Sequence, residues 1–318
     1  MGFKIAGLDP DLDTIRVPGM QRGRSDHRIA GTDRLVSVPT SGYFTDTYSD
    51  PRFRNCLLWR RFSVSSKTVS ADVALARLFS LRASSDLPRM LNCFCHKELI
   101  QLIRTRTGRV FRPPCPDYAF AAAVLALVRD FKLVSVPTFV AGIAHETIGD
   151  SFGERRDGPA LEFVREFGEV KIFKHVPIEA LVCINVIAAS LALVRETMSV
   201  ELASKSVDWV SYFTQCFHEL LYLEDRGVDV RAELEELRAA LSRQPRTIRV
   251  QVRLRTAAMS LYSPRIRTRI RTLVDSSQVL SRMTSGVLGR HLTHGHANGF
   301  RNIVEAAKYL EGCYSPTA

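Results

Sequence analysis

Apolar positions recur at the spacing of amphipathic helices through the middle of the chain. This period predicts helices over 70–81 and 88–105, and Gly108 is the expected stop of the second one. A third, Ala-rich and almost wholly apolar helix is expected to begin at Pro116, a residue suited to a first helical turn, and to run to Val128. The middle of the chain is therefore expected to contain three helices.

Short runs rich in branched and aromatic residues lie between these helices and predict strands. They cover 35–38, 109–111 and 132–143. Pro137 within the last run favours an edge position, because proline cannot donate a hydrogen bond to a neighbouring strand. We therefore expect an α/β unit over 35–156, preceded by an irregular segment at 1–34.

Beyond residue 158 helical periods replace strands almost completely. The expected helices cover 159–168, 177–198, 207–225, 228–242, 246–262, 264–285 and 298–311. The segment 157–318 is thus expected to form a mainly α-helical C-terminal domain.

The composition is that of a folded chain. Its 318 residues are 46% hydrophobic, enough for one large core or two modest ones. The longest apolar run, Ile178 to Val194, contains Glu179 and Asn185 and is shorter than the ~20 residues that span a bilayer, so we interpret it as a buried core helix. Seven cysteines, an odd number, and the lack of an apolar secretion signal in the first thirty residues favour a cytoplasmic location.

Basic residues exceed acidic ones and are concentrated in one segment. The 44 Lys and Arg against 33 Asp and Glu give a net charge of +11. No Asp or Glu occurs between Leu237 and Val274, where ten arginines occur: Arg238, Arg243, Arg246, Arg249, Arg253, Arg255, Arg265, Arg267, Arg269 and Arg271. Such a balance suggests an anionic partner, either a nucleic acid, a phospholipid surface or a phosphorylated substrate.

Three interpretations of the arginine-rich segment stay open. Peripheral binding to an anionic membrane would use the alternating arginines Arg265, Arg267, Arg269 and Arg271. Nucleic-acid binding is disfavoured, because interleaved aromatic residues are nearly absent. The simplest alternative is a solvated basic face that pairs with the acidic helix at Glu233, Glu235 and Glu236.

Cys93, Cys95 and His96 form a compact C-x-C-H sequence. A structural zinc site needs four ligands, and no second closely spaced pair completes the set. We therefore expect these residues to be buried on a helix face.

The stretch 108–149 carries a recognisable order of elements. A strand is followed by Pro116 and Asp117 at a helix start, a buried helix, a second strand, and a Gly-containing turn with His145 and Glu146. This order resembles the second half of the catalytic domain of family 2, GT-A-type glycosyltransferases, a bacterial branch of which has a Ser-Pro-Asp-Tyr-like motif at the helix start. The segments 35–57 and 213–230 resemble the flanking parts of the same branch.

The resemblance covers most of 35–318 and implies a partial GT-A-like α/β domain with a few strands, followed by a helical extension. It implies that Asp117 is the general base that takes the proton of the attacking acceptor hydroxyl. From the residues alone, Asp117 is equally suited to capping its helix. The resemblance also implies substrate contacts from Tyr43, Tyr118 and Glu146.

The same resemblance implies a divalent metal, Mg or Mn, that bridges the donor diphosphate. His145 is a candidate ligand or diphosphate contact, although a lone loop histidine is more often a surface residue. The family's Asp-x-Asp motif follows a buried strand in a nucleotide-binding half that this chain lacks. Asp11 and Asp13 have the spacing of that motif, but the residues before them, FKIAGL at 3–8, are a poor match to a buried strand.

The sequence therefore supports two hypotheses. In the first, the chain is a glycosyltransferase homologue, truncated or degenerate at its N-terminus, that acts on a nucleotide-sugar donor and a glycan or lipid-linked acceptor. In the second, it is a noncatalytic helical protein whose arginine-rich segment binds an anionic membrane surface or partner.

Overall fold

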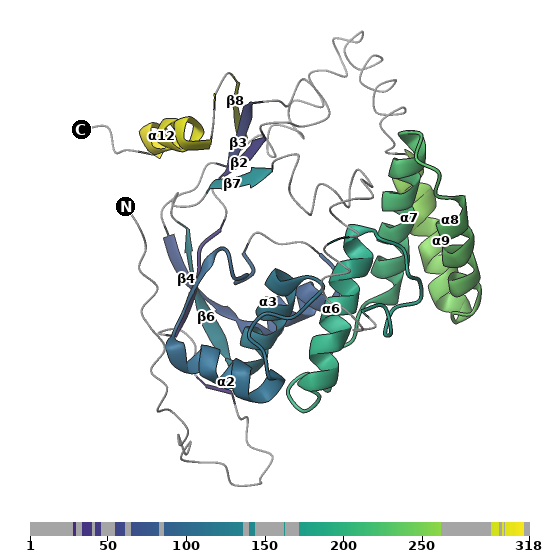
Figure 1. Cartoon of the computed structure of the whole chain (residues 1–318), viewed down its shortest axis with the longest axis horizontal. Helices are drawn as coiled ribbons and strands as arrows, with labels where there is room; N and C mark the ends of the chain where they lie inside the picture. The colour runs from purple at the N-terminus through teal and green to yellow at the C-terminus, as the bar shows by residue number, and fades with distance from the viewer. Residues whose placement is uncertain are drawn as a thin grey trace.

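The structure of the chain is a computed structural model (Figure 1). It describes residues 28–29, 34–39, 42–45, 55–60, 65–82, 86–135, 140–143, 162, 172–261, 294–298, 301 and 303–314. Within these residues the chain is a mixed α/β protein with two four-stranded sheets and eight α-helices. The mixed α/β class expected from the sequence is confirmed.

The first sheet has the strand order β4-β6-β1-β5. Its two central strands, β1 (Leu35–Ser37) and β6 (Asp130–Ser135), are parallel. The outer strands β4 (Ser65–Ser70) and β5 (Cys93–Cys95) run antiparallel to β6 and β1 respectively. The carboxyl ends of β1 and β6 therefore lie at the same edge of this sheet.

The second sheet has the order β7-β2-β3-β8. Strands β2 (Gly42–Thr45) and β7 (Val140–Ile143) are parallel, and β3 (Cys56–Arg60) runs antiparallel to β2. Strand β8 (His294–Asn298) pairs with β3, so the part of the chain beyond residue 158 is not wholly helical. Helix α12 (Ile303–Tyr314) contacts β2 and β7.

The most deeply buried helix is α3 (Pro116–Leu127), in which every residue from Ala119 to Leu127 is buried. Its small alanine side chains allow α1 (Ala71–Phe79), α2 (Lys97–Thr107) and α6 (Cys183–Thr197) to pack around it. Because α3 leads directly into β6, it is fixed to the sheet at its C-terminal end. The helix predicted from Pro116 to Val128 is confirmed.

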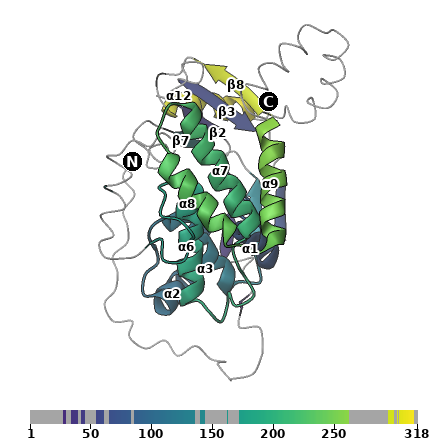
Figure 2. The ribbon, with the colours of Figure 1, turned by 90° about the vertical axis from the view of Figure 1, so that its right-hand side faces the viewer.

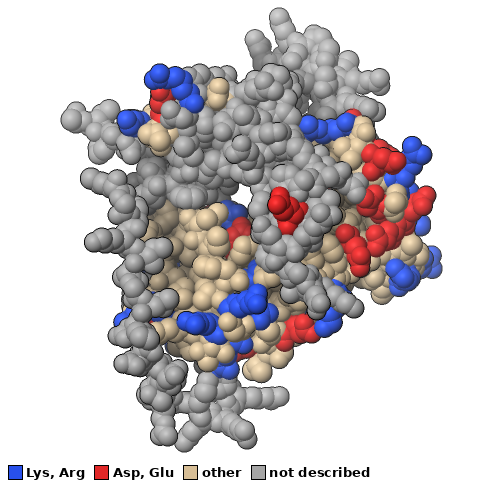
Figure 3. Space-filling model, in the orientation of Figure 1, with Lys and Arg blue, Asp and Glu red and all other residues tan. Residues whose placement is uncertain are grey.

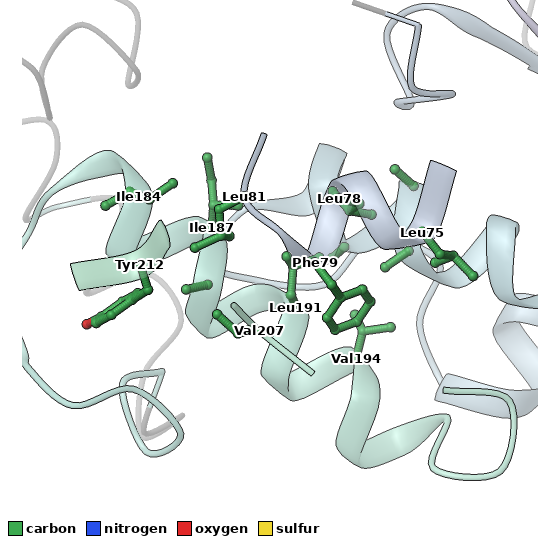
Figure 4. Close-up of a cluster of buried hydrophobic side chains, with 14 of the residues drawn as sticks. Leu75, Leu78, Phe79, Leu81, Ile184, Ile187, Leu191, Val194, Val207 and Tyr212 are labelled. Atoms are coloured by element: carbon green, nitrogen blue, oxygen red, sulfur yellow. The ribbon is translucent and has the colours of Figure 1, made fainter. Parts of the chain in front are cut away.

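The helical part continues through α7 (Trp209–Asp225), α8 (Arg231–Ser242) and α9 (Arg246–Leu261). Helix α7 packs against α6, α8 and α9, which makes it the centre of this layer (Figure 2). The core joins both parts of the chain: Phe79 of α1 points toward Leu191 and Val194 of α6 (Figure 4). One continuous cluster of buried side chains thus extends from the sheet helices into the helical layer.

Several predicted boundaries were wrong. The helix expected over 88–105 begins only at Lys97, because Cys93–Cys95 pair with β1 as a strand and His96 caps α2 through a hydrogen bond from the Glu98 N–H. Gly108 ends α2 as predicted, with a left-handed φ of 73° that glycine adopts without strain. Residues 109–111 form no strand.

The long strand expected over 132–143 is two strands in different sheets. Strand β6 lies inside its sheet and β7 at the edge of the other, while Pro137 lies outside the described residues. The helix expected over 177–198 begins at Cys183, whereas α7, α8 and α9 start within a few residues of their predicted positions. The helix expected over 264–285, nearly all of 159–168, and the boundary between 156 and 157 fall outside the described residues. The division into three domains therefore stays a prediction.

Candidate functional site

The candidate site begins with a loop that is fastened to the carboxyl end of β1. The Ser37 hydroxyl donates a hydrogen bond to the Asp86 carbonyl (3.0 Å). The buried Asn92 side chain donates to the Val38 carbonyl (3.0 Å), and the Val38 N–H donates to the Asn92 carbonyl (2.9 Å). Asn92 also accepts the Arg89 N–H through Oδ1 (3.0 Å). These bonds hold Arg89 at the carboxyl edge of the first sheet.

Arg89 brings a positive charge next to Asp117 at the start of α3. Its Nη1 lies 3.9 Å from Asp117 Oδ2, and its guanidinium lies over the Tyr118 ring, 5.8 Å from the centroid. The side chains of Arg89 and Asp117 are 22% and 20% exposed, so the pair is accessible but not surrounded by water. In open α/β sheets ligands bind beyond the carboxyl ends of the strands, which is where this pair lies.

The two oxygens of Asp117 have different surroundings. Oδ1 accepts a hydrogen bond from the Tyr118 N–H (2.9 Å) and another from the Cys115 thiol (3.0 Å between Sγ and Oδ1). Burial raises the pKa of Cys115 well above its usual value, so the thiol keeps the proton that it donates. Among the described residues Oδ2 accepts no hydrogen bond. The carboxylate is therefore fixed through one oxygen and open at the other.

The alternative interpretation, that Asp117 serves only to cap its helix, explains part of its contacts. Cys115, not Asp117, occupies the N-cap position of α3, and its side chain makes no capping hydrogen bond. Asp117 is the second residue of the helix and satisfies one N–H, that of Tyr118. Capping thus accounts for Oδ1, whereas Oδ2 faces the Arg89 guanidinium and accepts no hydrogen bond among the described residues.

The start of α6 lies beside the start of α3. The Cys115 N–H donates to the buried hydroxyl of Ser190 on α6 (2.8 Å), which fastens the two helices together. Helix α6 has no side-chain cap of its own, and Glu219 of α7 replaces it by accepting the Ile184 N–H (3.1 Å). Burial raises the pKa of Glu219 to about 7.

A second thiol lies between the two carboxylates. Burial, together with the negative charges of Glu219 and Asp117, raises the pKa of Cys183 to about 12. The thiols of this cluster are therefore protonated at neutral pH and are poor nucleophiles. The cluster offers one accessible carboxylate, one largely buried carboxylic acid and a neighbouring guanidinium.

Of the candidate site residues named from the sequence, the structure places Tyr118 beside Asp117 and does not place the others there. Tyr118 adjoins Asp117, and burial raises the pKa of its phenol to about 12. Tyr43 lies in β2, where its backbone is opposite Leu58 and Ala141 in the second sheet. The remaining candidates fall outside the described residues: His145, Glu146, Asp11, Asp13, Arg265, Arg267, Arg269 and Arg271.

Three members of the cluster were not expected from the sequence. Arg89, Cys115 and Glu219 reach Asp117 or its neighbours from a loop, a helix start and a separate helix. Arg89 was assigned to a helix that begins eight residues later, which hid its position. For Glu219 no spacing in the sequence gives a clue, because its partner lies 35 residues away on another helix.

The described residues do not form a metal site. In the described part of the chain, no group of three or more His, Cys, Asp or Glu side chains is arranged so that it could hold a metal ion. Cys93 and Cys95 lie on the edge strand β5, not on the helix face that we expected, and they pack against the core. His96 serves as the N-cap of α2.

Comparison with known proteins adds no relative. No protein-family model, curated protein or solved structure matches this chain. Among the helices that the structure describes, none has both the length and the apolar character needed to cross a bilayer.

Proposed function

We propose that the chain is a GT-A-like glycosyltransferase homologue that transfers a sugar from a nucleotide-sugar donor to a hydroxyl acceptor, with Asp117 as the general base. One observation supports this most strongly. Asp117 lies at the carboxyl edge of a parallel strand pair, with Oδ1 held by two donors and Oδ2 free of hydrogen bonds among the described residues. A carboxylate oriented in this way suits the alignment of an incoming hydroxyl.

The proposed step is a single displacement in which Asp117 takes one proton. The acceptor hydroxyl donates to Oδ2, and its oxygen attacks the anomeric carbon of the donor sugar. The new C–O bond forms as the bond to the diphosphate oxygen breaks, and the electron pair leaves with the nucleoside diphosphate. The proton ends on Oδ2, from which water can remove it.

In this proposal Arg89, which forms an ion pair with Asp117, also attracts the anionic donor. Its Nη1 stands 3.9 Å from Oδ2, and its buried Nε has no hydrogen-bond partner among the described residues. A guanidinium with unused donors favours anionic groups, and it would favour the approach of an anionic donor to this edge.

The divalent metal that the resemblance implies has no basis in the described residues. They contain no convergent set of ligands, and His145 lies outside them.

The experiment is a panel of nucleotide sugars, each incubated with the purified full chain and Mg²⁺ or Mn²⁺, with release of nucleoside diphosphate as the measured quantity. At least one donor is expected to be turned over, and Asp117→Asn is expected to abolish that release. Glu235→Gln removes a carboxylate from the exposed face of α8 and is the matched control. If no donor is consumed, or if Asp117→Asn releases diphosphate like the control, the noncatalytic hypothesis is favoured instead.

A further inference from the structure

Helix α9 has one face in the core and an opposite face that is both apolar and basic. Val252, only 1% exposed, packs into the core, and Ile248 lies partly buried on the same side. Arg255, although exposed, lies on the α7 side of the helix and donates to the Ser211 hydroxyl of α7 (3.4 Å). These contacts fix the rotation of α9 about its axis, and α9 packs along α7 (Figure 2).

The opposite face carries large apolar side chains that nothing in the described chain covers. Val250 is 45% exposed and Leu254, one turn further on, is 67% exposed. Their side chains are not needed for the core, which α9 already contacts through Val252. Isolated exposed apolar residues are common, but two in line on a helix form a stripe.

Arginines complete this stripe. Arg246 and Arg253 are exposed, and the positions 246, 250, 253 and 254 follow the i, i+4, i+7, i+8 spacing of a single helix face. Among the described residues no carboxylate lies within ion-pairing distance of Arg246 or Arg253. We call this set, Arg246, Val250, Arg253 and Leu254, the outer face of α9.

The charged side chains of α9 itself are all positive. The sequence has no Asp or Glu between Leu237 and Val274, so α9 has no acidic residue of its own. The acidic residues of the helical layer are on the neighbouring helices α7 and α8, and acidic and basic side chains lie beside each other at the right-hand side of the surface in Figure 3. The pairing of acidic and basic helices that was one expectation therefore does not involve Arg246 or Arg253.

We propose that the outer face of α9 binds an anionic membrane surface, with the helix lying parallel to the bilayer. Val250 and Leu254 would enter the boundary between head groups and acyl chains, while Arg246 and Arg253 contact lipid phosphates. An anionic lipid surface fits better than a nucleic acid because α9 has no aromatic residue on which a base could stack. The inference rests on α9 alone and is independent of the proposed transferase activity.

The expected contributions of the arginines and of the apolar side chains to membrane binding can be estimated from typical values for such groups. A basic residue near an anionic membrane contributes about fivefold to the binding constant, so loss of both arginines reduces binding by at least tenfold. Removal of the two apolar side chains is expected to reduce binding by a similar factor. The two components differ in their response to salt, which screens only the first.

The test is co-sedimentation of the full chain with vesicles of phosphatidylcholine mixed with phosphatidylglycerol, and with vesicles of phosphatidylcholine alone. The charge variant is Arg246→Gln with Arg253→Gln, and the apolar variant is Val250→Ser with Leu254→Ser. Matched controls are Arg104→Gln with Arg109→Gln, exposed arginines in the last turn of α2 and just after it, and Val200→Ser, an exposed valine outside α9. Circular dichroism and the urea midpoint show whether each variant is folded.

Binding to the anionic vesicles that is at least tenfold weaker in both α9 variants, and unchanged in the controls, is the expected result. Equal binding by wild type and the α9 variants would overturn the proposal, because another part of the chain would then carry the interaction. Absence of binding to the anionic vesicles would overturn it as well. So would tighter binding to a single-stranded oligonucleotide that depends on the two arginines but not on Val250 and Leu254.

Discussion

A substitution of Glu219 tests how the start of α6 is stabilised. Its side chain is partly buried between α6 and α7, and Oε2 accepts the Ile184 N–H (3.1 Å). Burial raises its pKa from 4.5 to about 7. We expect Glu219→Gln to remove a pH dependence of stability that the wild-type chain has between these two values.

The sign of this effect follows from proton binding. Between the unfolded and the folded pKa of Glu219, the folded chain holds a proton that the unfolded chain has lost. Stability is therefore highest below the unfolded pKa and falls as the pH rises through the folded pKa. A pKa difference from 4.5 to about 7 corresponds to a loss of up to about 3 kcal/mol, at ~1.4 kcal/mol for each unit.

Glutamine has nearly the same shape, stays neutral, and can still accept the Ile184 N–H through Oε1. The free energy of unfolding, measured by urea denaturation between about pH 5 and about pH 8, is expected to converge for the two proteins at the acidic end. At the alkaline end the variant is expected to be more stable by up to about 3 kcal/mol. Glu235→Gln, on the exposed face of α8, should show no such trend. A difference between wild type and Glu219→Gln that is constant with pH would refute the assignment of Glu219 as a buried acid.

Two further substitutions test the helical layer, with urea denaturation as the measurement. Tyr212→Phe removes the hydroxyl that donates to buried Asn185 Oδ1 (2.7 Å) and should cost about 1 to 3 kcal/mol, whereas Tyr222→Phe on the surface of α7 should cost little; equal losses would contradict the role of the buried hydrogen bond. Asp208→Ala removes the α7 cap that accepts the Val210 and Ser211 N–H groups and should cost about 1 kcal/mol, most of which Asp208→Asn should restore; a variant as stable as wild type would show that the cap is dispensable.

The parts of the fold that the sequence predicted are those with local causes. The start of helix α3 could be predicted because Pro116 suits a first helical turn and an unbroken apolar run follows. The end of α2 could be predicted because Gly108 adopts its left-handed φ without strain. Helices α7, α8 and α9 have clear amphipathic periods that match their observed faces. Local pattern was sufficient for these elements.

The errors have a different origin, because they depend on partners far along the chain. Residues 93–95 form a strand only because β1, almost 60 residues earlier, offers a free edge. Strand β8 forms against β3, more than 230 residues away, and its sequence HGHAN has no strand character of its own. Arg89 reaches Asp117 for the same kind of reason, since Asn92 fixes its loop to the end of β1.

In the candidate site too, local features could be predicted from the sequence, whereas contacts with distant residues could not. Asp117 was singled out from the sequence because it follows Pro116 at an expected helix start, and its role as a general base stays a prediction. Its anchoring by Cys115 follows from proximity in the chain, but the roles of Arg89 and Glu219 follow only from packing. A sequence pattern thus located one carboxylate, and the three-dimensional structure supplied its surroundings.

The central claim is that the free oxygen of Asp117 accepts a proton during sugar transfer, and one comparison tests it most directly. With the best donor of the panel at saturation, the turnover number of Asp117→Asn is compared with that of wild type, and donor binding is measured for both by calorimetry. Turnover lower by about 10²- to 10⁴-fold, with donor affinity nearly unchanged, is the expected result for loss of a general base. Turnover within a few-fold of wild type would contradict the claim and leave Asp117 as a structural residue of α3.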